Sequence, residues 1–173
     1  MVCISHYFKV RICTEINTPS EDDFTVLTNA TMGQVFNTIM DANTNYVWRY
    51  NEQTDAIYVH PKTNAISMMP CDKISVTNMS VKTLFAETDI WGVEGVKINL
   101  KGERKKNPGI EPWYWSDETV TLDFEEGAYV WQILDEIDSQ LTNGWFWSIA
   151  SDPQSSDCRV YFSHSFTNVL QKP

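Results

Sequence analysis

Two stretches of the sequence carry the same order of structural patterns, and this internal similarity constrains the fold more than any other feature. Residues 24–60 and 122–164 each predict a strand, a helix and two further strands. Both helical patterns place apolar residues at i, i+3, i+4 and i+7, with the second pattern 98 residues after the first. These positions are Met32, Val35, Phe36 and Ile39, and Val130, Ile133, Leu134 and Ile137. A repeated βαββ unit is therefore predicted.

Aromatic strands follow both predicted helices. Tyr46–Trp48 corresponds to Trp145–Trp147 at an offset of 99, and Ile57–Val59 corresponds to Val160–Phe162 at an offset of 103. The offset therefore grows in the turns, where insertions are best tolerated. The alternating aromatic residues of these strands, which include Tyr50, are interpreted as core.

Capping residues predict where two helices begin, and the pattern between the two repeats predicts a partial third unit. Thr31 and Gln34 predict a capping box for the first helix. A partial third unit consists of a strand at 73–76, a helix at 81–87 capped by Ser80, and a strand at 96–100.

The chain is accordingly divided into two parts. Residues 1–72 form the first unit with an N-terminal strand at 7–12, and residues 73–173 form the second part. The second part comprises the partial repeat at 73–100, a long loop at 101–117 and the second βαββ unit at 118–164. About three short helices on small antiparallel or mixed sheets make the predicted fold class α+β.

The net charge of -10 is concentrated at one end of the chain. Residues 1–110 hold 12 acidic and 11 basic side chains, whereas residues 111–173 hold 11 acidic and 2 basic ones. Nucleic acid is not an expected partner, because its binding depends on clustered Lys and Arg. Membrane insertion is not expected either, because no apolar run approaches the ~18 residues that a spanning helix needs.

The first unit resembles a known family. Its pattern of a small helix at 30–39, an aromatic strand ending at Trp48 and a hairpin to 57–61 is similar to the secretin and TonB short N-terminal domain, and residues 120–164 resemble it again. The resemblance implies βαβ units, a periplasmic setting with the signal peptide removed, and non-enzymatic contact with another protein of the cell envelope. A cytoplasmic setting is the alternative.

The long loop contains the first group of candidate binding residues. Trp113 and Trp115 would lie on one side of an extended segment and form a flat aromatic surface suited to a protein partner or a glycan. In the alternative interpretation, the loop folds back and its tryptophans cover the core. The candidate residues of this group are Trp113, Tyr114 and Trp115, with the basic residues Lys101, Arg104, Lys105 and Lys106.

The second group of candidate residues is acidic and lies on the second predicted helix. Asp135, Glu136 and Asp138 are expected opposite the apolar stripe and in contact with solvent. Such a face could dock a basic partner, whereas acid–base catalysis by two carboxylates would require a pocket that separates their pKa values.

Signals for metal or cofactor chemistry are weak. His60, His164, Cys71 and Cys158 follow none of the tight local spacings of structural zinc sites, and the sequence holds no glycine-rich phosphate loop. No cofactor or enzymatic activity is therefore expected. The predicted function is a non-enzymatic interaction module that uses its sheet edges, the 101–117 loop or the acidic helix. The alternative is a carbohydrate- or small-ligand-binding domain with a tryptophan platform.

Overall fold

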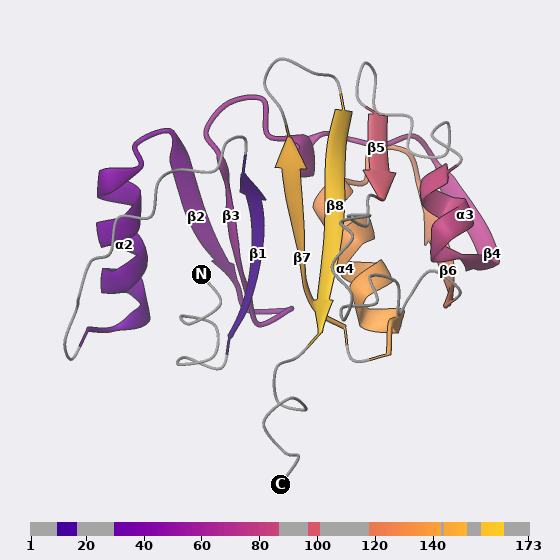
Figure 1. Ribbon diagram of the computed structural model, residues 1–173, viewed down its shortest axis with the longest axis horizontal. Coiled ribbons are helices and arrows are strands. Elements are labelled where there is room, and N and C mark those ends of the chain that lie inside the picture. Colours follow the sequence, from indigo (N-terminus) through magenta and orange to yellow (C-terminus); the bar gives the residue numbers. More distant parts are fainter. Residues whose placement is uncertain are drawn as a thin grey trace, which may run out of the picture.

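The computed structural model describes residues 10–16, 30–86, 97–100, 118–142, 144–151 and 157–164. Within these ranges it contains helices and small mixed and antiparallel sheets, which confirms the predicted α+β class (Figure 1). The elements are β1 (Arg11–Ile16), α2 (Met32–Ala42), β2 (Tyr46–Asn51), β3 (Ala56–Pro61), the short 3-10 helix η1 (Ile66–Met68), β4 (Ile74–Ser80), α3 (Val81–Ala86), β5 (Lys97–Leu100), β6 (Thr119–Phe124), α4 (Val130–Gln140), β7 (Gly144–Ser151) and β8 (Asp157–His164).

The strands form a six-stranded mixed sheet with the order β2-β3-β1-β7-β8-β5 and a separate antiparallel pair, β4-β6. The central strand β1 pairs in parallel with β3 on one side and β7 on the other. β2–β3 and β7–β8 are antiparallel hairpins. The large sheet therefore includes strands from both predicted parts of the chain.

The position of β1 differs from the predicted strand at residues 7–12. β1 shares only Arg11 and Ile12 with that prediction and continues to Ile16, whereas residues 7–9 lie outside the described part of the chain. The predicted first strand at 24–26 also lies outside it. The remaining predicted strands coincide with β2 to β8 to within a few residues.

The two faces of the large sheet contact different helices. Alternate residues of β1 and β3, such as Ile12 and Ile57, form a small core with Phe36 of α2. The residues between them, such as Cys13 and Tyr58, belong to the main core with α4. Strands that are buried on both faces are typical of the centre of a sheet with parallel pairing. In Figure 1, α2 lies beside the β2 end of the sheet, and α3, β4 and β6 gather at the β5 end.

Two helix starts follow the predicted capping signals. The backbone N–H of Gln34 donates to Thr31 Oγ1 at 3.3 Å, and the N–H of Thr31 donates to Gln34 Oε1 at 2.8 Å. This reciprocal pair confirms the predicted capping box of α2. At α3, the N–H of Thr83 donates to Ser80 Oγ at 3.1 Å, as expected for a serine cap.

The burial of the predicted apolar positions is uneven. Val130, Ile133, Leu134 and Ile137 are fully buried, as predicted for α4. Tyr50, predicted to be core, is 43% exposed because β2 is an outer strand among the described strands. No helix within the described ranges is long and apolar enough to cross a bilayer.

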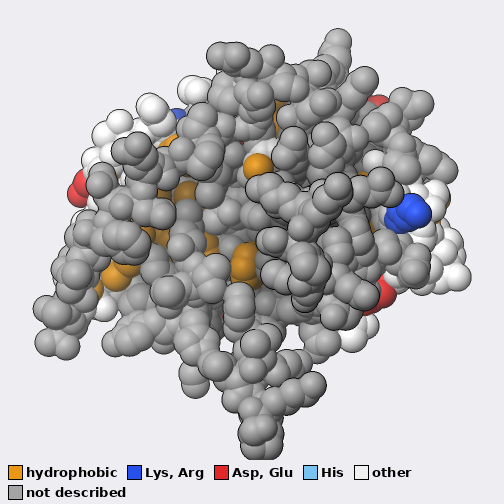
Figure 2. Space-filling view, viewed as in Figure 1, with side chains coloured by type: hydrophobic (Ala, Val, Ile, Leu, Met, Phe, Trp, Pro, Cys, Tyr) orange, Lys and Arg blue, Asp and Glu red, His pale blue; other side chains and the backbone are white. Residues whose placement is uncertain are grey.

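Charged side chains occupy the rim of the face shown in the space-filling view. Figure 2 shows the described Lys, Arg, Asp and Glu side chains near the outline, with described hydrophobic side chains visible toward the middle. One exposed ion pair joins the two-stranded sheet to the turn before α4, with Lys73 Nζ 2.8 Å from Glu125 Oε1. An exposed pair of this kind contributes little stability.

Candidate functional site

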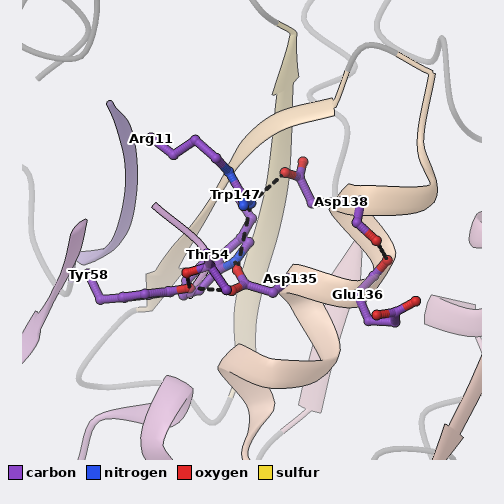
Figure 3. A network of polar contacts seen from close by, with 8 residues as sticks. Arg11, Thr54, Tyr58, Asp135, Glu136, Asp138 and Trp147 are labelled. Carbon is purple, nitrogen blue, oxygen red and sulfur yellow. Dashed lines mark hydrogen bonds and ion pairs between the residues drawn. The ribbon is translucent and has the colours of Figure 1, made fainter. Parts of the chain in front are cut away.

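A buried network of polar side chains lies between α4 and the large sheet (Figure 3). We call it the polar cluster; it consists of Arg11 of β1, Tyr58 of β3, Asp135 and Asp138 of α4, and Trp147 of β7. Asp135 and Asp138 are only 9% and 3% exposed. They lie three residues apart and therefore share one side of the helix.

Asp135 accepts hydrogen bonds from two strands of the sheet. Trp147 Nε1 donates to Asp135 Oδ1 at 2.7 Å, and the Tyr58 hydroxyl donates to Asp135 Oδ2. Because the Tyr58 hydrogen is used in this bond, the Thr54 hydroxyl is the donor in its 3.0 Å contact with Tyr58 Oη. Both oxygens of Asp135 therefore have a donor within the fold.

Asp138 forms the other half of the cluster. Arg11 Nη2 donates to Asp138 Oδ2 at 2.8 Å and lies 3.7 Å from Asp135 Oδ1, so one guanidinium nitrogen serves two carboxylates. Asp138 Oδ1 is shielded from solvent and has no hydrogen-bond partner among the described residues. An unsatisfied oxygen of this kind makes the ionised carboxylate costly.

The expectation that the acidic residues of α4 contact solvent is wrong for two of the three. The structure buries Asp135 and Asp138, whereas Glu136 is exposed and accepts from Gln140 Nε2 at 2.7 Å. The physical reason is that α4 contacts β7 of the large sheet and also β6 and η1, so its buried surface is wider than one apolar stripe.

Burial changes the proton affinity of the cluster. It raises the pKa of Asp138 to about 6, against the opposing effect of Arg11 and with a further increase from Asp135. It also raises the pKa of Asp135, although the bonds from Tyr58 and Trp147 favour the ionised form. Asp138 has the proton affinity of an acid–base group, but its oxygens contact Arg11 or are shielded from solvent. The contacts therefore favour a role in joining α4 to the sheet.

Beside the polar cluster, Arg49 of β2 packs against two aromatic rings that meet edge to face, with their centres 5.3 Å apart. Its Cζ atom lies 5.1 Å from the centre of the Tyr58 ring and 4.7 Å from that of Trp131. These distances are typical of cation–π contacts. Arg49 Nε and Nη2, and Trp131 Nε1, are shielded from solvent and make no hydrogen bond in the described part of the structure. Three N–H donors in this area thus lack an acceptor.

Strand β2 presents part of its backbone away from the sheet. It pairs with β3 without a register shift from Tyr46 to Asn51, and the Lys62 N–H donates to Asn45 O at 2.9 Å. The alternation of an antiparallel ladder then directs the N–H and C=O groups of Trp48 and Tyr50 outward. Among the described strands, none pairs with this outer side.

A third buried carboxylate, that of Glu15, receives hydrogen bonds from the fold at both of its oxygens. Glu15 of β1 is 1% exposed and accepts from the N–H groups of Ile66 and Ser67 at 2.7 and 2.8 Å, and from Ser67 Oγ at 2.6 Å. These amides begin η1, where backbone donors are otherwise unpaired. Glu15 therefore anchors this turn to the central strand.

The candidate residues of the long loop lie outside the described part of the chain. These are Lys101, Arg104, Lys105, Lys106, Trp113, Tyr114 and Trp115. The side chains of Cys158 and His164 also lie outside it, whereas Cys71 is buried and His60 Nδ1 is 2.8 Å from the Pro61 carbonyl oxygen. No group of three potential metal ligands occurs within the described ranges.

Sequence reasoning did not select Arg11, Tyr58 or Trp147 as partners of the acidic residues. The sequence of β1 held one indication of the cluster. Arg11 and Glu15 lie on the same face of the strand as Cys13, and two charged residues on one face are unusual in a central strand. No family model matches this chain, and no similar protein was found among curated proteins or solved structures. Functional inference therefore rests on the geometry.

Proposed function

We propose that this chain is a non-enzymatic interaction module that binds a protein partner by accepting an extended segment along β2. The observation that carries the proposal is the outward direction of the Trp48 and Tyr50 backbone groups, which have no paired strand among the described residues. An added strand satisfies such groups by main-chain hydrogen bonds, and alternate side chains supply specificity.

The composition of β2 supports this use. Outer strands are usually protected by charged side chains, above all lysine, or by proline, bulges or short length. β2 has six residues, Tyr-Val-Trp-Arg-Tyr-Asn, with neither lysine nor proline. Its one charged residue, Arg49, packs against two rings, and no bulge interrupts the pairing of β2 with β3. Its aromatic and β-branched residues favour an extended conformation. Tyr50 is exposed and available for side-chain contact.

The resemblance to secretin and TonB short N-terminal domains supports a partner in the cell envelope and an extracytoplasmic setting. The contacts of Asp135 and Asp138 support the non-enzymatic part of the proposal, because the fold itself uses three of their four oxygens. These carboxylates are then structural residues.

Two substitutions at Tyr50 test strand addition. Tyr50→Pro removes the outward N–H, whereas Tyr50→Val removes the same side chain and its bond to Asp55 but keeps the N–H. Peptides would be selected from a random phage library on the immobilised wild type. Their affinities would then be measured by fluorescence polarisation for all three proteins, after circular dichroism confirms that each is folded.

We expect Tyr50→Pro to weaken binding about tenfold or more relative to Tyr50→Val, because one main-chain hydrogen bond is lost and the ring obstructs the strand. In the wild type, peptide binding should also slow hydrogen exchange at the Tyr50 amide. Equal affinities for the Pro and Val variants, or a library that yields no binder, would refute the proposal.

A further inference from the structure

Arg49 packs against two aromatic rings and lacks hydrogen-bond partners at one edge of its guanidinium group. The Tyr58 and Trp131 rings lie 5.1 and 4.7 Å from its Cζ atom. Nε and Nη2, which have no hydrogen-bond partner, form the edge that binds a carboxylate through two parallel N–H···O bonds. The ring contacts therefore hold the guanidinium group without using the hydrogen-bonding capacity of this edge.

The described surroundings of Arg49 supply no acceptor for these donors. Asp135 accepts from Trp147 and Tyr58, and Asp138 pairs with Arg11. Arg49 is near enough to Asp135 to favour its ionised form, but no ion pair joins Arg49 to a described carboxylate. A charged donor without an acceptor is costly when shielded from water, and native proteins rarely retain one. An acidic side chain beside Arg49 would reduce this cost by pairing with its charge.

The position of Arg49 on β2 places its unpaired guanidinium next to the edge where a strand would be added. Arg49 lies between Trp48 and Tyr50, whose backbone groups point outward. In an added antiparallel strand that bonds to these two residues, one residue would face Arg49 directly. The Cβ atoms of such a pair lie ~4.5–5.5 Å apart, and both side chains lie on the same face of the sheet. That face is the one that carries Tyr58.

We propose that the segment bound along β2 carries Asp or Glu at the position opposite Arg49, an inference that rests on the proposed function. The carboxylate pairs with the positive charge of the Arg49 guanidinium. Its neighbours in the segment lie on the opposite face with Trp48 and Tyr50, whose rings favour apolar or aromatic side chains. A lysine opposite Arg49 would be repelled, because like charges in direct cross-strand pairs are unfavourable.

A double-mutant cycle tests the acidic position. Peptides selected on the wild type would be synthesised with their acidic residue unchanged or replaced by Gln, and titrated against wild type, Arg49→Met and Arg49→Lys. We expect the change to Gln to weaken binding to the wild type about tenfold and to leave binding to Arg49→Met almost unchanged. Arg49→Lys should restore part of the preference, since it keeps the charge without the two-pronged edge.

Substitutions of Arg49 also remove its packing against two rings, so a measurement on the wild type alone is needed. A salt titration provides it. The acidic peptide should lose affinity for the wild type between 50 and 500 mM salt, and the Gln peptide should lose much less. Peptides that bind without an acidic preference, but still lose affinity on Tyr50→Pro, would overturn this inference and leave the proposed function standing.

If no selected peptide distinguishes Tyr50→Pro from Tyr50→Val, strand addition itself fails and both proposals are rejected. If sedimentation shows a dimer of the wild type that Tyr50→Pro abolishes, β2 pairs with a second copy of the chain, which rejects the foreign acidic segment but retains strand addition.

Discussion

Trp147 Nε1 donates a 2.7 Å hydrogen bond to Asp135 Oδ1 and thereby joins β7 to the helix that precedes it in the chain. Both residues are buried. The bond provides a specific polar contact between layers that are otherwise held together by apolar packing, and such contacts favour one arrangement of a helix on a sheet.

Trp147→Phe should destabilise the fold by about 1 to 3 kcal/mol, because Asp135 Oδ1 loses a donor while most of the aromatic volume remains. Urea denaturation followed by circular dichroism measures the free energy of unfolding. Trp131→Phe is the matched control, since Trp131 Nε1 has no hydrogen-bond partner among the described residues. Equal losses in the two variants would show that the hydrogen bond contributes little.

Stability should depend on the protonation of Asp138. Burial, despite Arg11, raises its pKa from 3.8 to about 6 in the folded protein, so the native state binds the proton more tightly than the unfolded chain. The resulting stabilisation is complete below about pH 4 and is lost as the pH rises through about 6. Its full size is about 3 kcal/mol.

The variant Asp138→Asn should abolish this part of the pH profile. We expect the free energy of unfolding of the wild type to fall more than that of the variant between pH 4 and pH 7, as measured by urea denaturation at each pH. Asp123→Asn, which changes an exposed aspartate of β6, should retain the wild-type profile. Parallel profiles for wild type and Asp138→Asn would contradict the assignment.

Glu15→Ala should destabilise the protein by about 3 kcal/mol or more, because the amides of Ile66 and Ser67 and the Ser67 hydroxyl lose their buried acceptor. Glu15→Gln keeps one acceptor oxygen and should cause a smaller loss. The exposed Glu52→Ala serves as the control and should change the thermal midpoint by a degree or so at most. An unchanged midpoint for Glu15→Ala would argue against the anchoring role of this residue.

The buried thiols should be protected in the native protein. Burial, with a smaller effect of Asp72, raises the pKa of Cys71 to about 12, and burial also raises the pKa of Cys13. Since the thiolate is the reactive species, iodoacetamide at pH 8 should label both residues far more slowly in native than in denatured protein. Peptide mass spectrometry gives the rate at each cysteine. Rapid native labelling of Cys13 would show that β1 is accessible.

The sequence pattern was sufficient for the local structure. The i, i+3, i+4 and i+7 spacing located α2 and α4, and the capping residue Thr31 located the start of α2. These features depend on neighbours within one or two turns, so they can be read from a short window. The equivalence of the two βαββ stretches remains a prediction of the sequence.

Exposure could not be predicted in the same way. A helical wheel treats the side opposite one apolar stripe as solvent, and this assumption fails for Asp135 and Asp138 because α4 is covered from more than one direction. The donors that make their burial possible come from Arg11, 124 residues before Asp135, and from Trp147, 12 residues after it. Their proximity depends on strand order.

By itself, the sequence determined most of the segments that form the described helices and strands, though not the bounds of β1, and that they combine into an α+β fold, because hydrophobic periodicity and capping are local properties. Only the tertiary structure decided that β1 lies at the centre of the large sheet, that β2 is an outer strand and that three acidic residues, Glu15, Asp135 and Asp138, are buried. These properties depend on pairing between distant segments, since the solvation of a charge is set by every element packed around it.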